Sequence, residues 1–389
     1  MRHRGAKQDG VDRTAARKRD TAAVGLWAFG ASVIAARAIY ESYQLTAPGL
    51  PSLSDVAARF ARFDYIHFDD IARLGYLPEP GTASTAAPLY AFFPAIPMLL
   101  RLGMALGLSS IVTGLLVSAV SGAVASVWMR RIADEYLPGL GLKAAAVFVL
   151  APPAIFLYAP YTESLFLAFG LGAWYFAMRG RWLTAAILCA FSCTVRISGA
   201  FLLAALIVLW ITSRYRAGGG NVPAPSRNSW MFLALPTAVL AGWMGYLWRI
   251  TGDPLAYSTA QKYVFWNRHF EWPWPALQRT ITTYPPTGGA SVMGYAETIA
   301  VAAGLIVTAV LVYRRLYGES VFVGINVLLL TFSTYFYSVP RSALLWWPLW
   351  IGIAYILRRS RTALVVYLLF SLWLMLWWAG LFLNGLWAG

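Results

Sequence analysis

The stretch from Arg62 to Tyr76 contains residue types that could move a proton. If this stretch is helical, Asp64, His67 and Phe68 share one face, because positions three and four apart are neighbours on a helix. A carboxylate held partly out of water, with its pKa set by its neighbours, can act as a general base on a hydroxyl group. The spacing alone leaves a second interpretation open, which is an ordinary solvated helix face.

Two arginines, Arg196 and Arg341, lie in or beside apolar runs, where a charge is costly and usually functional. A guanidinium group binds phosphate through two parallel hydrogen bonds and could stabilise the charge that develops on a departing phosphate. Each arginine also has a structural alternative. Arg341 could extend to a lipid headgroup, and Arg196 could pair with Glu163, an acid that the start of a helix would itself favour.

One long polar connection, residues 251–293, carries three more cationic side chains, Lys262, Arg268 and His269. They could contribute to anion binding or simply belong to a wet loop. The polar connections contain no dedicated cage of carboxylates, so we expect no required metal and no cofactor. The two cysteines, four positions apart without a histidine nearby, are expected to be small buried side chains rather than a zinc site.

The composition is that of a membrane protein. Hydrophobic residues make up 59% of the 389 positions and charged residues only 12%, whereas a soluble domain has about twice that charged fraction. The net charge of +15 does not indicate nucleic-acid binding, because most basic residues lie in short clusters between apolar runs, as the positive-inside rule describes. We therefore expect an all-α polytopic protein whose solvent is the lipid bilayer.

The apolar runs predict about eleven transmembrane helices within a single membrane domain, residues 22–389, preceded by a disordered basic cytoplasmic tail, residues 1–21. No cleavable signal peptide is apparent. The predicted spans are residues 22–40, 109–128, 143–158, 162–178, 182–195, 198–212, 230–250, 294–313, 320–337, 342–357 and 362–384.

A further apolar run, residues 89–107, contains several prolines and is expected to be re-entrant or interfacial. If it crossed the bilayer, every later basic cluster would change sides. Two long outer loops, residues 41–108 and 251–293, then share the extracytoplasmic face. In the first loop we expect an amphipathic helix that begins at a Ser52–Asp55 capping box and ends at Gly75.

Several segments, in this order, resemble the GPI mannosyltransferase II (PIG-V-like) family and its bacterial relatives, which belong to the GT-C superfamily of membrane glycosyltransferases. The family usually starts its first motif with Trp-Asp, where this chain has Phe63-Asp64, so the stacking partner differs while the carboxylate is kept. The similar segments, spread over roughly residues 60–345, are Phe63-Asp64-x-x-His67-Phe68 to Gly75-Tyr76 and Glu79, Phe92-Phe93-Pro94-x-x-Pro97, Pro160-Tyr161-Thr162-Glu163-Ser164-Leu165-Phe166, Arg196-Ile197-Ser198-Gly199, Gly252-Asp253-Pro254 through Trp266, and Ser338-Val339-Pro340-Arg341.

The resemblance implies a GT-C-like fold and an inverting transfer of mannose, or another hexose, from a polyprenyl-phosphate sugar to an acceptor hydroxyl at the extracytoplasmic face of the plasma membrane. The acceptor could be a glycolipid, a glycan or a protein. Asp64 matches the position of the catalytic base. The residues expected to bind the donor and its phosphate are His67, Tyr161, Glu163, Arg196, Lys262, Arg268, His269 and Arg341.

Two other classes of protein remain as alternatives. A transporter or flippase for lipids or lipid-linked sugars would also place charge and proline-broken segments within the membrane. However, the sequence has no inverted repeat, and its polar residues gather near one face rather than at the midplane. A membrane scaffold without catalysis would explain the helices but not the paired outer loops.

Overall fold

The computed structural model of the chain describes residues 2–47, 49–215, 223–282 and 290–388, and these ranges contain helices and no β-strand. The longer helices are α1 (Arg2–Thr46), α5 (Ser110–Tyr136), α8 (Thr162–Met178), α9 (Trp182–Cys193), α10 (Ser198–Tyr215), α11 (Ala234–Thr251), α14 (Ala290–Tyr313), α15 (Tyr317–Thr331) and α18 (Arg361–Leu383). The shorter elements are α2 (Leu53–Ala58), α3 (Asp64–Leu74), η1 (Leu89–Ala91), α4 (Ala95–Ala105), α6 (Gly141–Val149), η2 (Pro152–Ala154), α7 (Ile155–Tyr158), η3 (Ser229–Leu233), α12 (Ala256–Lys262), α13 (Pro273–Thr282), α16 (Val339–Ala343) and α17 (Trp347–Leu357).

Five of the described helices are long and apolar enough to cross a bilayer, whose hydrocarbon core of about 30 Å needs about 20 residues. They are Thr14–Thr46, Ser110–Tyr136, Ser229–Thr251, Val292–Tyr313 and Arg361–Leu383. A sixth candidate span combines Gly141–Val149 with Pro152–Tyr158, which are bent by 72° at a proline pair that interrupts the helical hydrogen bonds. The all-α polytopic class is thus confirmed, whereas the total of about eleven spans stays a prediction.

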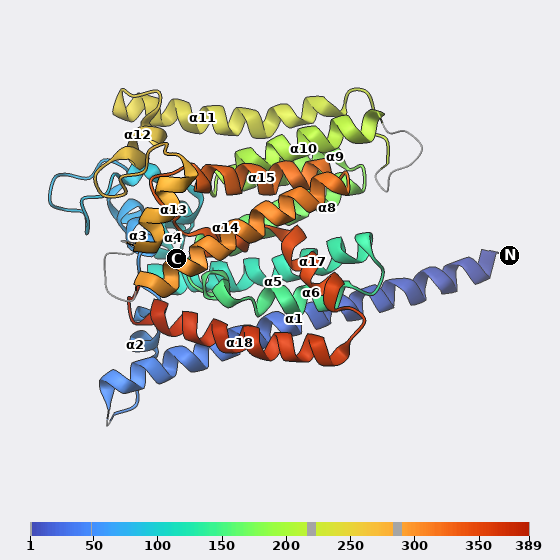
Figure 1. Cartoon of the computed structure of the whole chain (residues 1–389), viewed down its shortest axis with the longest axis horizontal. Coiled ribbons are helices and arrows are strands. Elements are labelled where there is room, and N and C mark those ends of the chain that lie inside the picture. Colours follow the sequence, from blue (N-terminus) through green and yellow to red (C-terminus); the bar gives the residue numbers. More distant parts are fainter. Residues whose placement is uncertain (1, 48, 216–222, 283–289, 389) are drawn as a thin grey trace.

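The long helices run side by side along the long axis of the molecule, and the short helices α2, α3, α4, α12 and α13 gather at the end opposite the N-terminus (Figure 1). Helix α4 has 11 residues, which is only about 16 Å at 1.5 Å per residue. It is therefore too short to cross by itself, and the re-entrant or interfacial placement of residues 89–107 stays a prediction. Arg101 Nε donates to the carbonyl of Ala72 at 2.8 Å and ties α4 to α3.

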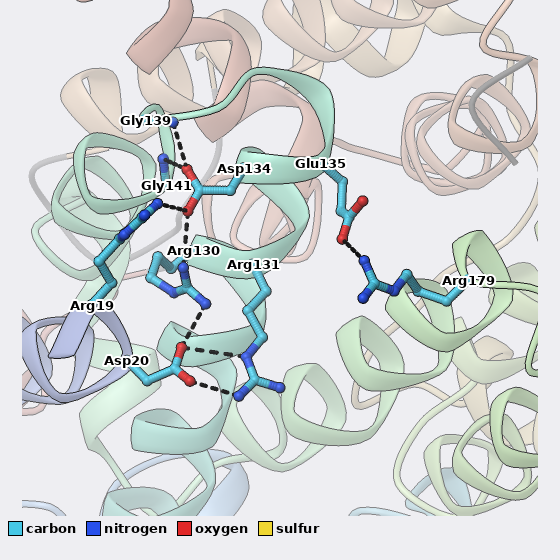
Figure 2. A network of polar contacts seen from close by, with 9 residues as sticks. All are labelled: Arg19, Asp20, Arg130, Arg131, Asp134, Glu135, Gly139, Gly141 and Arg179. Atoms are coloured by element: carbon cyan, nitrogen blue, oxygen red, sulfur yellow. Dashed lines mark hydrogen bonds and ion pairs between the residues drawn. The ribbon is translucent and has the colours of Figure 1, made fainter. Parts of the chain in front are cut away.

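Residues 2–21, which the sequence predicts to be a disordered tail, form the beginning of helix α1 in the structure. Asp20 forms ion pairs with Arg130 and Arg131 of α5, each at 2.6 Å, and Arg19 approaches Asp134 (Figure 2). The end of this segment, at Arg19 and Asp20, is therefore joined to α5 by ion pairs. Basic clusters that the sequence assigns to one side of the membrane meet at this end of the molecule.

The amphipathic helix predicted in the first loop is broken into two. Ser52 and Asp55 form the predicted capping box, and Gly75 ends the second helix with a φ of 87°. The chain between α2 and α3 leaves the helical conformation, and Phe63 just before α3 has a φ of 50°. The capping box therefore starts α2 only, and α3 begins independently at Asp64.

Candidate functional site

Helix α3 presents Asp64 from its first turn. The residue before it, Phe63, has a φ of 50° and a ψ of −117°, a conformation that is costly for a bulky residue and is found most often at functional sites. The ring of Phe63 packs against Phe382 and Trp387. The backbone amide of Asp64 donates to the hydroxyl of Tyr161 at 3.2 Å, and that hydroxyl donates to the carbonyl of Arg62 at 3.1 Å. Asp64 is thus held by the start of α8.

Four charged side chains meet here, and we name them the Asp64 cluster: Asp64, Glu163, Arg196 and Arg341. Arg341 on α16 donates from Nη1 to Asp64 Oδ2 at 2.6 Å and from Nε to Glu163 Oε1 at 2.7 Å. Its guanidinium group also lies over the ring of Tyr161, 4.5 Å from the centroid, and near the ring of Phe156 at 5.3 Å. One arginine therefore joins the two carboxylates.

Arg196 approaches Glu163 from the turn between α9 and α10. Its Nη1 donates to Glu163 Oε1 at 2.5 Å and to Thr162 Oγ1 at 3.3 Å. The turn is tight, since a Cβ atom on Gly199 would lie 2.5 Å from the Cα of Cys193. Only a residue without a side chain fits there, which explains the glycine that closes the motif Arg196-Ile-Ser-Gly199.

The cluster balances two negative charges with two positive ones. Glu163 is fully buried, while the side chains of Asp64 and Arg196 keep 28% and 20% of their surface exposed. A buried carboxylate needs such pairing, because an unpaired charge away from water is strongly unfavourable. The exposed edge of the cluster thus presents an acid beside a cation. An acid could accept a proton there while the cation binds an anion.

His67 lies one turn further along α3 and is buried. Its Nδ1 is 3.2 Å from Thr85 Oγ1, and its ring stacks on Phe92 at 4.9 Å between centroids. Burial lowers the pKa of His67 below its ordinary value of 6.5, although the nearby carboxylates of Asp64 and Asp70 act in the opposite direction. The imidazole is therefore neutral near pH 7 and can bind a substrate as a hydrogen-bonding group rather than as a cation.

The three cationic residues predicted from the second outer loop behave differently from one another. Lys262 is exposed, and no contact joins it to the Asp64 cluster within the described ranges. Arg268 lies over the ring of Tyr337 at 5.5 Å. His269 is exposed, and its Nδ1 lies 3.2 Å from Thr334 Oγ1.

This loop packs on the segment that leads into Arg341. Tyr335 donates its hydroxyl to the carbonyl of Trp266 at 2.6 Å, and the amide of Phe336 donates to Thr280 Oγ1 at 2.8 Å. Arg268 and His269 therefore lie beside the segment that leads into Arg341.

The structure also contains partners that the sequence analysis did not single out. Thr162 bonds Arg196, and the ring of Phe156 packs under Arg341. Thr162 lies inside a predicted motif, which was a usable signal, but nothing in the sequence near Phe156 pointed to Arg341. In the described part of the chain, no group of three or more His, Cys, Asp or Glu side chains is placed to hold a metal ion.

Comparison with known proteins connects this site to a family. Residues 57–217 match the family described as Mannosyltransferase (PIG-V). This segment is PIG-V-like. Among curated proteins, the chain is 33% identical over 151 residues to GPI alpha-1,6-mannosyltransferase 2 of Homo sapiens, and the proteins of that name from Rattus norvegicus and Mus musculus are 32% and 33% identical over the same length. No solved structure matches.

Each of these alignments covers 36% of this chain and 29% of the relative, so the match spans less than a third of the curated relatives' length. The PIG-V-like segment contains three of the four charged residues of the Asp64 cluster, namely Asp64, Glu163 and Arg196. Arg341 lies outside it, and the fold brings it to the other three.

Proposed function

We propose that this protein is a membrane mannosyltransferase that uses a polyprenyl-phosphate sugar as its donor and works at the extracytoplasmic face. The observation that supports this most is the Arg341–Asp64 ion pair of 2.6 Å, in which the acid belongs to a PIG-V-like segment. A partly exposed carboxylate next to a buried guanidinium supplies the two groups that the reaction needs, a proton acceptor and a phosphate-binding cation.

In the proposed reaction, Asp64 accepts the proton of the acceptor hydroxyl while the oxygen attacks the anomeric carbon of mannose. The bond from that carbon to the phosphate oxygen breaks, and its electron pair leaves with the polyprenyl phosphate. A single in-line displacement inverts the anomeric configuration. The chain supplies cations for the growing negative charge on the phosphate, which is where electrostatic stabilisation lowers a barrier most.

The proposal gives Arg341 two successive partners. Before the donor binds, Arg341 neutralises Asp64. A lipid phosphate would compete for the guanidinium group, since phosphate also accepts its paired N–H donors. Transfer of Arg341, together with Arg196, to the phosphate would release Asp64 to act as a base. Arg268 would add positive charge at the edge, and His67 and Tyr161 would border the sugar.

The experiment uses purified protein in lipid nanodiscs with polyprenyl-phosphate-[³H]mannose and a panel of glycolipid, glycan and peptide acceptors. Appearance of labelled product, with the inverted linkage established by NMR, supports the proposal. We expect the reaction to continue in EDTA, because the proposed roles are all filled by side chains. A protein that yields no product with any acceptor but moves the labelled lipid between leaflets of vesicles would instead be a flippase.

A further inference from the structure

Glu297 is a buried acid that the proposed reaction does not use. It lies in the membrane-spanning helix α14, and its side chain has no exposed surface. An ionisable residue at such a position is costly and usually marks a function. Its two oxygens accept hydrogen bonds from adjacent backbone amides, Oε1 from Ser338 at 3.0 Å and Oε2 from Val339 at 2.7 Å. Glu297 therefore binds the backbone of the segment that begins at Ser338.

The two amides that Glu297 binds begin α16, the short helix that carries Arg341. Ser338, its first flanking residue, has a φ of 58° and makes no side-chain capping bond. A left-handed serine persists only where the surrounding structure imposes it, and the first amides of a helix need acceptors from outside. Glu297 supplies both acceptors, so the start of α16 is fixed by α14.

The direction of Arg341 depends on this start, because Arg341 follows Ser338 by less than one helical turn. Its Nη1 and Nε lie 2.6 Å from Asp64 and 2.7 Å from Glu163, and a small rotation of α16 would break both bonds. We propose that Glu297 is a positioning residue that holds Arg341 in register with Asp64. Its effect on sugar transfer rests on the proposed function, while its effect on α16 does not.

The substitution that tests this is Glu297→Gln, because an amide side chain keeps one acceptor oxygen and turns an N–H group toward the second backbone amide. Glu297→Ala removes both acceptors. The matched control is Glu319→Gln on α15, which also changes a buried glutamate, but one bonded to Tyr136 at the end of α5 where Arg130 and Arg131 lie. Any general loss of stability or activity that comes from replacing a buried acid will appear in this control as well.

The first readout is hydrogen exchange measured by mass spectrometry on the intact protein in nanodiscs. We expect the amides of Ser338 and Val339 to exchange at least about tenfold faster in Glu297→Gln, and faster still in Glu297→Ala, because each lost acceptor removes a protecting bond. Peptides of α17 should keep the wild-type exchange rate in both Glu297 variants. In Glu319→Gln, the Ser338 and Val339 amides should keep the wild-type exchange rate. Unchanged exchange of the Ser338 and Val339 amides in Glu297→Ala would overturn the proposal.

The second readout is the kinetics of mannose transfer. Glu297→Gln should lower kcat about tenfold or more with the acceptor KM nearly unchanged, and should add little to Arg341→Lys, because residues acting through one group are non-additive. Additive losses, or a kcat equal to that of Glu319→Gln, would overturn the positioning role. If the wild type transfers no sugar at all, the proposed function fails, and the exchange rates still decide whether Glu297 holds α16.

Discussion

Arg341 Nη1 lies 2.6 Å from Asp64 Oδ2, although the two residues are 277 positions apart in the sequence. The carboxylate comes from the first turn of α3 and the guanidinium group from α16. Phe63, directly before Asp64, and Ser338, three positions before Arg341, both have a positive φ. Strained backbone at both ends of one ion pair is typical of a functional site. The predictions below depend on this pair and its neighbours.

Replacing Arg341 by lysine should lower kcat/KM for transfer by at least about a hundredfold. An ammonium group is a point charge, whereas the planar guanidinium contacts Asp64 and Glu163 through two separate nitrogens. The measurement is steady-state kinetics with the lipid-linked donor. Arg279→Lys is the control, because Arg279 also contacts a carboxylate through two nitrogens but belongs to α13. Equal activity of wild type and Arg341→Lys would remove Arg341 from the site.

Replacing Glu163 by glutamine should destabilise the protein even without substrate. Glu163 is fully buried and bonded to both Arg196 and Arg341, and removing one partner of a buried pair costs about 3–5 kcal/mol because charge is left uncompensated. Thermal unfolding in detergent should show a clearly lower midpoint.

The corresponding control for Glu163→Gln is Glu271→Gln, which breaks a partly exposed pair with Arg279. A surface pair of this kind contributes about 1 kcal/mol or less. Similar midpoints for the two variants would contradict the account of a buried, compensated cluster.

Some residues of the site could be predicted from the sequence, and others could not. Asp64, Glu163 and Arg196 could be brought together because each lies in a short motif beside an apolar run, and the positive-inside rule placed the motifs on one side. Glu297 could not, since its role is to accept hydrogen bonds from amides 41 and 42 positions away. Such a contact depends on how α14 packs against α16, which no local pattern encodes.

The fold shows the same division. The apolar runs predicted the long helices, because span length follows from bilayer thickness, and the positive-inside rule predicted that residues 89–107 do not cross. The break at Phe63 was missed because the residues on both sides continue the apolar stripe, and a conformation imposed by packing on Phe382 and Trp387 leaves no mark in the local sequence. The tail over residues 1–21 was predicted from its composition, and composition could not show that Asp20 pairs with Arg130 and Arg131 of a distant helix.

Lowering the pH from about 7 toward 5 should destabilise the protein through His67. Burial lowers the pKa of the folded imidazole below 6.5, so between 6.5 and that lower value the unfolded state binds more protons, and stability falls as the pH falls. Unfolding midpoints measured across this range should drop less in His67→Gln. His269→Gln, which changes an exposed histidine, should keep the wild-type slope. An unchanged slope in His67→Gln would contradict this assignment.

Of the cationic residues in the second outer loop, Arg268 should affect the donor KM and Lys262 should not. Arg268→Ala should raise the donor KM about tenfold, because Arg268 stands over Tyr337 beside the route to Arg341 and contributes charge to phosphate binding. Lys262→Ala, an exposed lysine in the same loop, should change the donor KM by less than about twofold. The reverse order would show that the donor approaches from the other side of the loop.

The most direct test of the central claim compares Asp64→Asn with Asp69→Asn in the mannose-transfer assay. Both substitutions make the same chemical change on helix α3, but Asp69 pairs with Arg73 rather than with the Asp64 cluster. A general base contributes about a hundredfold to ten-thousandfold to the rate. We therefore predict that Asp64→Asn lowers kcat at least about a hundredfold while Asp69→Asn stays within about threefold of wild type. Equal kcat values for Asp64→Asn and wild type would show that Asp64 is not the base.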